Sequence, residues 1–243
     1  MIEYVNQLGA GAPLTGPAPT GTDAVVWSLD TTADALGGYR TQDAPTVLDA
    51  GEREKAARLR LPGLRHRYLA AHLGVRVLLG SYLGLPPQEV PLTREDCPCC
   101  GEPHGRPAVT GNPLHFSLSH TGDIAYIALA ALPVGVDIEM TPSAETVTDV
   151  IRSLHPDETG ELNALTPAER PEALARLWSR KEACLKAAGT GLALGLVDPY
   201  VGTRPTPPPL ADYTLIDLPA PRGHAAALAL THPGSTPGPG TTV

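Results

Sequence analysis

Residues 115–140 read HFSLSHTGDIAYIALAALPVGVDIEM, and this stretch determines most of the predicted fold. Apolar and polar residues surround a turn at Gly122, which indicates two strands running from His115 to about Ala131. Pro133 interrupts the pattern, and the run VGVDIEM that follows it predicts another short strand. We therefore expect sheet structure in the middle of the chain, with Pro133 close to a boundary between two halves.

On the N-terminal side, the chain predicts one strand and two helices. DAVVWSLD (residues 23–30) is typical of a strand, and residues 1–22 read as irregular. Asp49 and Glu52 form a capping-box pattern that starts a helix through about Leu59. A longer amphipathic helix is expected from about Leu64 to Leu83, where Gly84 ends it.

On the C-terminal side, TPAE (residues 166–169) predicts a helix that runs to about Ala188, with Thr166 as N-cap and Pro167 as its first residue. YTLIDL (213–218) and HAAALAL (224–230) predict strands, and HPGSTPGPGTTV (232–243) predicts a frayed tail. Residues 122–130 and 223–231 resemble each other weakly. This similarity favours a fold of two related α+β halves.

Composition excludes several classes of protein. A chain of 243 residues with 42% hydrophobic content has a substantial core, and its apolar runs are shorter than the roughly 18 residues that a membrane span needs. The N-terminus lacks the pattern of a signal peptide, and three of the four cysteines lie together, so we expect a cytoplasmic protein without a disulfide framework. The net charge of −8 argues against nucleic acid as a partner.

Residues 51–76 depart from this acidic average. Seven basic residues against two glutamates give the segment a charge of +5. Such a segment suits a phosphorylated ligand or an acidic partner, although a solvated helix face has the same composition. Only three lysines occur among the 18 basic residues, namely Lys55, Lys181 and Lys186.

Two segments carry the residue types of a metal and phosphate site. Asp137 and Glu139 project from the same face of the predicted strand, where two carboxylates can bind one hard divalent cation. Glu182 and Lys186 lie four residues apart and share a helix face, so Glu182 could be a third ligand and Lys186 a phosphate-binding cation. Lys181, about 100° away, could meet a diphosphate. Each pattern also occurs as exposed acids or a surface Glu–Lys pair.

The turn at residues 119–122 places Ser119, His120 and a second hydroxyl at its rim. A phosphate site suits these side chains better than a Ser–His catalytic pair, because adjacent residues on a strand point to opposite faces. A turn histidine without a ligand is the simpler interpretation. The loop at 97–104, CPCCGEPH, has the spacing of metal ligands in Cys97, Cys100 and His104. A structural zinc needs a fourth ligand, for which Cys99 is the nearby candidate but has awkward geometry, so ordinary reduced thiols are the favoured interpretation.

Four motifs occur in order: GRP (105–107), FSLSHTG (116–122), GVDIE (135–139) and WSRKEACLK (178–186). Together they resemble the signature series of 4′-phosphopantetheinyl transferases of the surfactin-synthetase-activating type. The resemblance covers about residues 47–192. It implies an α+β fold in which two similar halves form a pseudo-dimer, here residues 1–132 and 133–243, with the active site in the cleft between them.

The resemblance also implies roles for individual residues. Magnesium, with manganese as an expected substitute, would be held by Asp137, Glu139 and Glu182, and Lys186 would contact the phosphates. The coenzyme A site would be formed by Lys55, Arg67, Gly105, Arg106, Pro107, Ser119, His120 and Lys186. Arg106 stands where the family has lysine, and Ser117 and Thr121 where it has asparagine and serine, which changes donor geometry but keeps the turn polar.

The implied reaction moves phosphopantetheine from coenzyme A to a serine of an acyl or peptidyl carrier protein and releases 3′,5′-ADP. Glu182, Lys186 and Glu139 are the implied catalytic residues, and the proton acceptor could be Glu182 or a water beside Glu139. We expect a monomer whose partners are coenzyme A and the carrier protein. The alternatives are another magnesium-dependent phosphate enzyme, such as a phosphohydrolase, and a non-catalytic module that binds carrier proteins.

Overall fold

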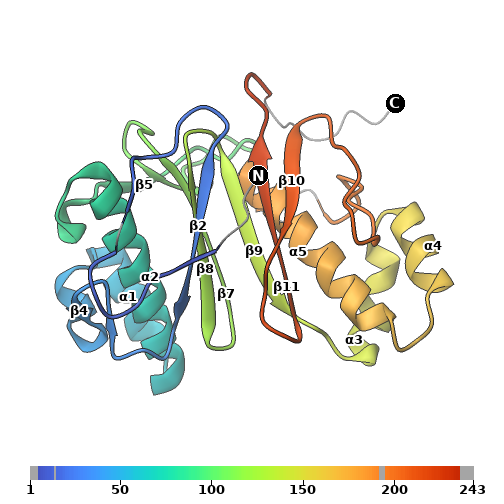
Figure 1. Cartoon of the computed structure of the whole chain (residues 1–243), viewed down its shortest axis with the longest axis horizontal. Helices are drawn as coiled ribbons and strands as arrows, with labels where there is room; N and C mark the ends of the chain where they lie inside the picture. Colours follow the sequence, from blue (N-terminus) through green and yellow to red (C-terminus); the bar gives the residue numbers. More distant parts are fainter. Residues whose placement is uncertain (1–4, 14, 192–194, 236–243) are drawn as a thin grey trace.

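The computed structural model describes residues 5–13, 15–191 and 195–235. Its strands and helices come in groups along the chain: strands, then helices, then strands, and the same again towards the C-terminus (Figure 1). Among the described residues, short 3-10 helices lie at Thr41–Thr46, Pro87–Glu89 and Ile151–Ser153. The remaining elements are β1 (Asn6–Gln7), β2 (Ala24–Asp30), β3 (Ala35–Leu36), β4 (Tyr39–Arg40), α1 (Ala50–Arg58), α2 (Pro62–Leu83), β5 (Leu92–Arg94), β6 (Pro107–Val109), β7 (His115–Thr121), β8 (Ile124–Ala130), β9 (Val134–Met140), α3 (Ala144–Val150), α4 (Pro156–Ala164), α5 (Arg170–Ala188), β10 (Tyr213–Leu218) and β11 (His224–Thr231).

The first sheet has the strand order β1-β2-β8-β7 and packs against helix α2. Side chains alternate along β8: Ile127 and Leu129 join the core beneath α2, while Tyr126 and Ala128 face the other way. The strand–turn–strand predicted from His115 to about Ala131 is confirmed as β7 and β8. Helix α2 ends at Gly84, which adopts the left-handed conformation with φ of 68°.

The second sheet has the order β10-β11-β9 and packs against helix α5. Along β9, Val134, Val136 and Ile138 face the first sheet. The intervening Gly135, Asp137 and Glu139 therefore face α5. The predicted strand thus divides an apolar face from a face that carries carboxylates.

These elements form four layers, helices–sheet–sheet–helices, with the two sheets side by side in the centre (Figure 1). An apolar cluster from β2, β8, β9 and β11 fills the space between the sheets. In both sheets the chain forms one long strand, then helices, then two more long strands, and the last of the three lies between the other two. The mixed α+β fold is confirmed, and the three long strands of the two sheets share one order.

Several predictions of local structure were wrong. Residues 6–7, expected to be irregular, form β1 parallel to β2. Helix α5 begins at Arg170, because the Glu169 carboxylate accepts from both the N–H and the hydroxyl of Thr166, so that hydroxyl donates instead of capping. Pro171 is the second helical residue and has no N–H, which further favours this start. Helices α3 and α4 were not predicted, and most of the predicted frayed tail lies outside the described residues.

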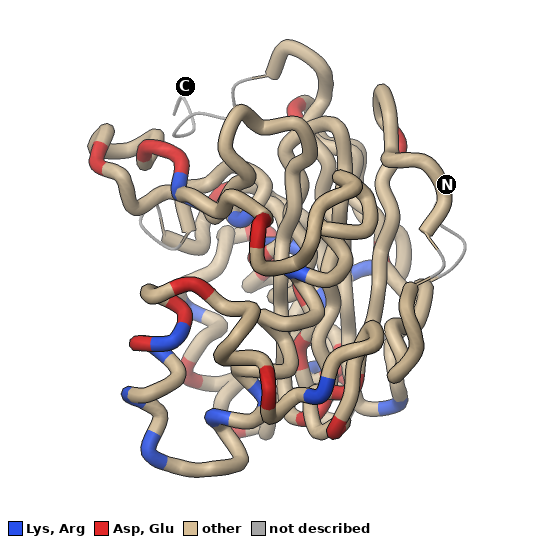
Figure 2. Tube along the Cα trace, turned by 90° about the vertical axis from the view of Figure 1, so that its left-hand side faces the viewer, with Lys and Arg blue, Asp and Glu red and all other residues tan. Residues whose placement is uncertain are grey.

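The basic segment 51–76 folds as α1 and the first part of α2, where basic and acidic positions lie close together (Figure 2). Arg76 does not belong to a solvated face, since it is buried and pairs with Asp49 at 2.7 Å and with Glu52 at 2.6 Å. The exposed members of this group are Arg53, Lys55, Arg58, Arg60 and Arg65. None of the helices among the described residues combines the length and apolar character that a membrane span requires.

Candidate active site at the junction of the two sheets

The carboxylate of Asp137 lies at the junction between the sheets. Asp137 is only 2% exposed. Its Oδ1 accepts from the Ser119 hydroxyl on β7 at 2.8 Å and from the Lys186 ammonium on α5 at 2.5 Å. One carboxylate oxygen therefore joins β7, β9 and α5.

Serine hydroxyls connect the facing strands β7 and β9. The Val136 N–H donates to Ser117 Oγ at 3.1 Å, and the Ile138 N–H donates to Ser119 Oγ at 3.4 Å. The hydroxyls thus accept from amides on the β9 edge that does not pair with β11. Ser117, which replaces the family's asparagine, keeps a polar acceptor at this position. Ser119, predicted to bind the cofactor, is buried and orients Asp137.

Helix α5 approaches β9 closely enough to place its side chains beside these acids. A Cβ at Gly135 would lie 1.9 Å from the carbonyl oxygen of Ala183, so only glycine allows this packing. Glu182 and Lys186 are half-buried and lie one turn apart on the helix. Lys186 also donates to the carbonyl of Val136 at 3.3 Å. The glycine of the GVDIE motif therefore determines how near the lysine comes to Asp137.

The electrostatics of the site favour additional positive charge. Burial, and then repulsion from Asp137, raises the pKa of Glu139 to about 7, although Lys186 acts in the opposite direction. Burial also raises the pKa of Glu182. Asp137 Oδ2 is buried and has no hydrogen-bond partner. Two glutamates with raised pKa values and an aspartate with an unpartnered oxygen form a hard donor set that fits a divalent cation such as magnesium.

The oxygen atoms of three carboxylates, those of Asp137, Glu139 and Glu182, do not all lie within 4.8 Å of one another. Among the described residues, the group of Cys, His, Asp or Glu that does meet this criterion is a different one. Mutual repulsion explains the spacing, because Lys186 neutralises only part of the charge. Binding of a divalent cation would require Glu139 and Glu182 to move towards Asp137.

A cavity of about 870 Å³ lies beside Lys186, between elements of both halves. Five residues predicted to bind coenzyme A line it: Lys55, Gly105, Arg106, Pro107 and Lys186. Its wall comes from α1, α2, β7, the end of α5 and the loop between β5 and β6. The cavity therefore brings together basic residues that are up to 131 positions apart in the sequence.

Arg106 links the two sides of the cavity. Its guanidinium pairs with Glu95 at 2.7 Å and also donates to the carbonyl of Ala187, near the end of α5. Its Nε is buried without a hydrogen-bond partner. The substitution of arginine for the family's lysine thus adds donors that tie the β5–β6 loop to the second half.

Arg67 and His120 do not line this cavity, but they lie near the same hairpin turn. Arg67 pairs with Asp123, whose carboxylate accepts from its Nε at 2.8 Å. Asp123 follows Gly122 in the turn between β7 and β8. Burial, then the charges of His72 and Lys186, lowers the pKa of His120.

The interpretation of Lys181 as a diphosphate contact was wrong. Lys181 is completely buried and pairs with the equally buried Glu158 at 2.8 Å. Its ammonium also donates to the carbonyls of Val197 and Pro199. All three donors of the ammonium are thus engaged inside the second half, where Lys181 has a structural role.

Sequence reasoning missed Tyr68 and His72, which line the cavity from α2. Their rings stack with centroids 4.0 Å apart, and the buried Tyr68 hydroxyl has no hydrogen-bond partner. Because they are four residues apart in a predicted helix, the sequence could have shown that the two rings lie on one helix face. They add an aromatic surface to the cavity wall.

Comparison with known proteins agrees with this geometry. Residues 133–229 match the model of the 4′-phosphopantetheinyl transferase superfamily. The 4′-phosphopantetheinyl transferase HetI of Nostoc sp. is 31% identical over 169 residues, which cover 69% of this chain and 70% of that protein. The chain belongs to the 4′-phosphopantetheinyl transferase family. The matched region contains Asp137, Glu139, Glu182 and Lys186.

Two relatives from Bacillus subtilis support this membership. A 4′-phosphopantetheinyl transferase is 31% identical over 152 residues, covering 62% of this chain and 64% of the relative. The 4′-phosphopantetheinyl transferase Sfp of strain 168 is 29% identical over 146 residues, covering 60% of this chain and 62% of Sfp. The chain therefore aligns with somewhat less than two thirds of these two family members.

Proposed function

We propose that this chain transfers the 4′-phosphopantetheine arm of coenzyme A to a serine of an acyl or peptidyl carrier protein. The observation that carries the proposal is the Lys186–Asp137 ion pair, which joins α5 to β9 at the wall of the cavity. Family membership supplies the reaction class. The cavity suits a ligand with several phosphate charges, because Lys55, Arg106 and Lys186 all border it.

In this reaction the serine hydroxyl oxygen attacks the β-phosphorus of coenzyme A. A new P–O bond forms, the bond between the β-phosphorus and the bridging oxygen breaks, and 3′,5′-ADP leaves with the bond electrons. Lys186 would hold the diphosphate oxygens and stabilise the charge that develops on the leaving group. The serine proton would pass to Glu182 or to a water beside Glu139.

Asp137, Glu139 and Glu182 would hold magnesium. When bound, the ion would neutralise the diphosphate charge and orient it for in-line attack. Arg67 and His120 would bind the 3′-phosphate near the β7–β8 turn. Ser119 would act by fixing Asp137, and Gly105, Arg106 and Pro107 would border the nucleotide.

We also propose that residues 1–132 and 133–243 are two related halves of a pseudo-dimer. Two observations support this division: the shared order of strand, helix, strand and strand, and the apolar layer between the sheets. The four free cysteines agree with a cytoplasmic location. We further propose that the protein is a monomer.

The test is mass spectrometry of an apo carrier protein incubated with the enzyme, coenzyme A and magnesium. We expect a mass gain of one phosphopantetheine on serine and an equal amount of 3′,5′-ADP. Manganese should replace magnesium, whereas calcium should support little turnover because its coordination is larger and less regular. Nucleotide release without a carrier protein would instead indicate a phosphohydrolase.

Variants connect this assay to the site. Asp137→Ala, Glu139→Ala and Glu182→Ala should each remove most transfer while the far-UV circular dichroism stays unchanged. Glu89→Ala, which removes an exposed carboxylate in a short 3-10 helix, is the matched control and should keep full activity. Full activity of Asp137→Ala, or of the wild type in excess chelator, would refute the proposed metal site.

A further inference from the structure

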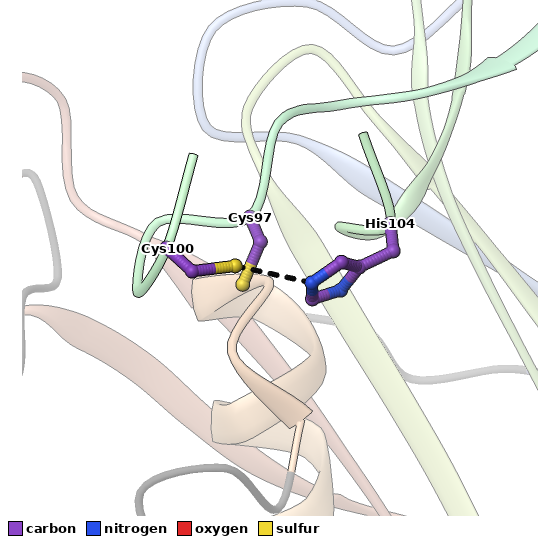
Figure 3. Close-up of side chains that lie close together, drawn as sticks. All are labelled: Cys97, Cys100 and His104. Atoms are coloured by element: carbon purple, nitrogen blue, oxygen red, sulfur yellow. Dashed lines mark hydrogen bonds between the residues drawn. The ribbon is translucent and has the colours of Figure 1, made fainter. Parts of the chain in front are cut away.

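The loop that joins β5 to β6 brings two thiols and an imidazole together at the cavity wall. The sulfur atoms of Cys97 and Cys100 and a ring nitrogen of His104 all lie within 4.8 Å of one another. Cys100 Sγ and His104 Nε2 are 3.1 Å apart, and the three side chains point towards one another (Figure 3). None of these residues belongs to the carboxylate site described above.

We propose that this loop binds a zinc ion through Cys97 Sγ, Cys100 Sγ and His104 Nε2, with a water as the fourth ligand. Zinc–sulfur bonds of about 2.3 Å and zinc–nitrogen bonds of about 2.0–2.1 Å place tetrahedral ligand atoms about 3.6–3.8 Å apart. Cys100 Sγ and His104 Nε2, at 3.1 Å, are about half an ångström closer than this value, and all three ligand atoms lie within 4.8 Å of one another. Small side-chain rotations would therefore complete the coordination.

The backbone of the loop is already shaped for such a site. The N–H groups of Cys100 and Gly101 both donate to the carbonyl of Cys97, at 3.3 and 2.7 Å. Gly101 adopts a φ of 77°, a conformation that glycine takes without strain and that returns the chain towards His104. The turn therefore holds Cys97 and Cys100 close to each other without a bound ion.

Further backbone bonds hold the third ligand. The N–H of Cys97 and the N–H of His104 both donate to the carbonyl of Glu102, each at 2.7 Å. Gly105 donates to the carbonyl of Glu95 at 2.9 Å and closes the base of the loop. His104 is thus tied to the same short segment as the two thiols, which reduces the entropic cost of ordering the ligands.

The chemistry of the donors selects the ion. Thiolate and imidazole are soft and borderline ligands that prefer zinc, whereas magnesium requires hard oxygen ligands. Cys99 is exposed and lies outside the group of three, so it is not a ligand in this proposal. The zinc site and the carboxylate site would therefore bind different ions in one chain.

The position of the loop suggests what the ion does. Cys97 and His104 line the cavity together with Arg106, which follows His104 by two residues. An ion that links Cys97 to His104 would stiffen the loop that presents Arg106 to Glu95 and to the end of α5. We assign the zinc ion a positioning role at the wall of the cavity, independent of the transfer reaction.

The test measures metal in untagged protein purified with reductant and dialysed without chelator. We expect one equivalent of zinc by elemental mass spectrometry, and excess magnesium should not displace it. After replacement by cobalt, the protein should show intense d–d bands of tetrahedral coordination and thiolate-to-cobalt charge transfer. Zinc should also slow proteolysis within residues 95–106. Less than a tenth of an equivalent, with no cobalt spectrum on reconstitution, would overturn the proposal.

Variants assign the ligands. Cys100→Ser and His104→Ala change exposed side chains, so the fold should persist by circular dichroism, while zinc affinity should fall at least tenfold. Cys99→Ser is the matched control, since it removes a neighbouring thiol and should keep one equivalent of zinc. Equal loss in Cys99→Ser and Cys100→Ser would refute the three-ligand assignment. Failure of phosphopantetheine transfer would leave these readouts unaffected.

Discussion

Neutralising Glu139 should stabilise the metal-free protein and abolish its response to magnesium. The pKa of Glu139 is raised from the 4.5 of a free glutamate to about 7, first by burial and then by the charge of Asp137. Between these values the folded state binds more protons than the unfolded state. Stability therefore falls as pH rises from about 4.5 to 7, and the full cost is present above pH 7.

The size of this cost follows from the shift. At 1.36 kcal/mol per pKa unit, the shift corresponds to about 3 kcal/mol as an upper bound. Because the side chain is only partly buried, we expect on the order of 2 kcal/mol. For a chain of this size, 2 kcal/mol corresponds to an increase of about 4–8 °C in melting temperature. Glu139→Gln should gain this amount at pH 8 and almost nothing at pH 4.5.

The assay compares thermal and urea unfolding of the wild type and Glu139→Gln in chelator from pH 4.5 to 8.5. Titrating groups far from Glu139 contribute equally to both proteins, so the difference reports Glu139 together with the neighbouring charges of Asp137, Glu182 and Lys186. Adding magnesium at pH 8 should stabilise the wild type by mass action and leave the variant nearly unchanged. Glu89→Gln, a change at an exposed acid, is the control and should follow the wild type. Destabilisation of Glu139→Gln at pH 8, or a difference that does not vary with pH, would refute this reasoning.

Three further outcomes are expected. Lys181→Met should destabilise the fold by about 3–5 kcal/mol in denaturant titration, because it leaves Glu158 buried and unpaired. A loss of stability below about 1 kcal/mol would contradict the Lys181–Glu158 ion pair. Arg67→Ala and His120→Ala should each weaken coenzyme A binding by about 1.5–3 kcal/mol in calorimetry and have little effect on 3′-dephospho-coenzyme A, whereas equal losses would refute the 3′-phosphate assignment. The apparent KM for an acidic carrier protein should rise with salt concentration, and this rise should be steeper for the wild type than for Arg60→Glu. A KM that does not change with salt would indicate an apolar docking surface.

The sequence predicted the six longer strands, β2 and β7 to β11, because strand patterns of this length are a local signal, but it did not predict the short strands β1 and β3 to β6. In VGVDIEM, the apolar residues Val134, Val136 and Ile138 face the opposite sheet, as their spacing required. Helix starts were less predictable. The TPAE pattern looked like a capping box, but the pattern alone does not show whether the Thr166 hydroxyl caps the helix or donates to the Glu169 carboxylate.

The candidate site shows the same limit. Spacing placed Glu182 and Lys186 on one helix face, and Lys186 does contact Asp137. Spacing could not show that Lys181 faces a buried carboxylate 23 residues earlier in the chain, because nothing local distinguishes Glu158 from other acids. Likewise, helical periodicity could not show that Tyr68 borders a cavity shared with the other half of the chain.

The apolar layer between the two sheets has a consequence for how the chain evolves. Three of its eleven buried members are alanines, at positions 128, 130 and 226, so parts of this contact are small. Separate subunits would need an interface strong enough to overcome dilution. Here the connection at Pro133 holds the halves at a high effective concentration, and a modest interface suffices. Covalent linkage therefore lets the shared layer tolerate small side chains, and under the proposed division into two related halves it would let their sequences diverge while they remain associated.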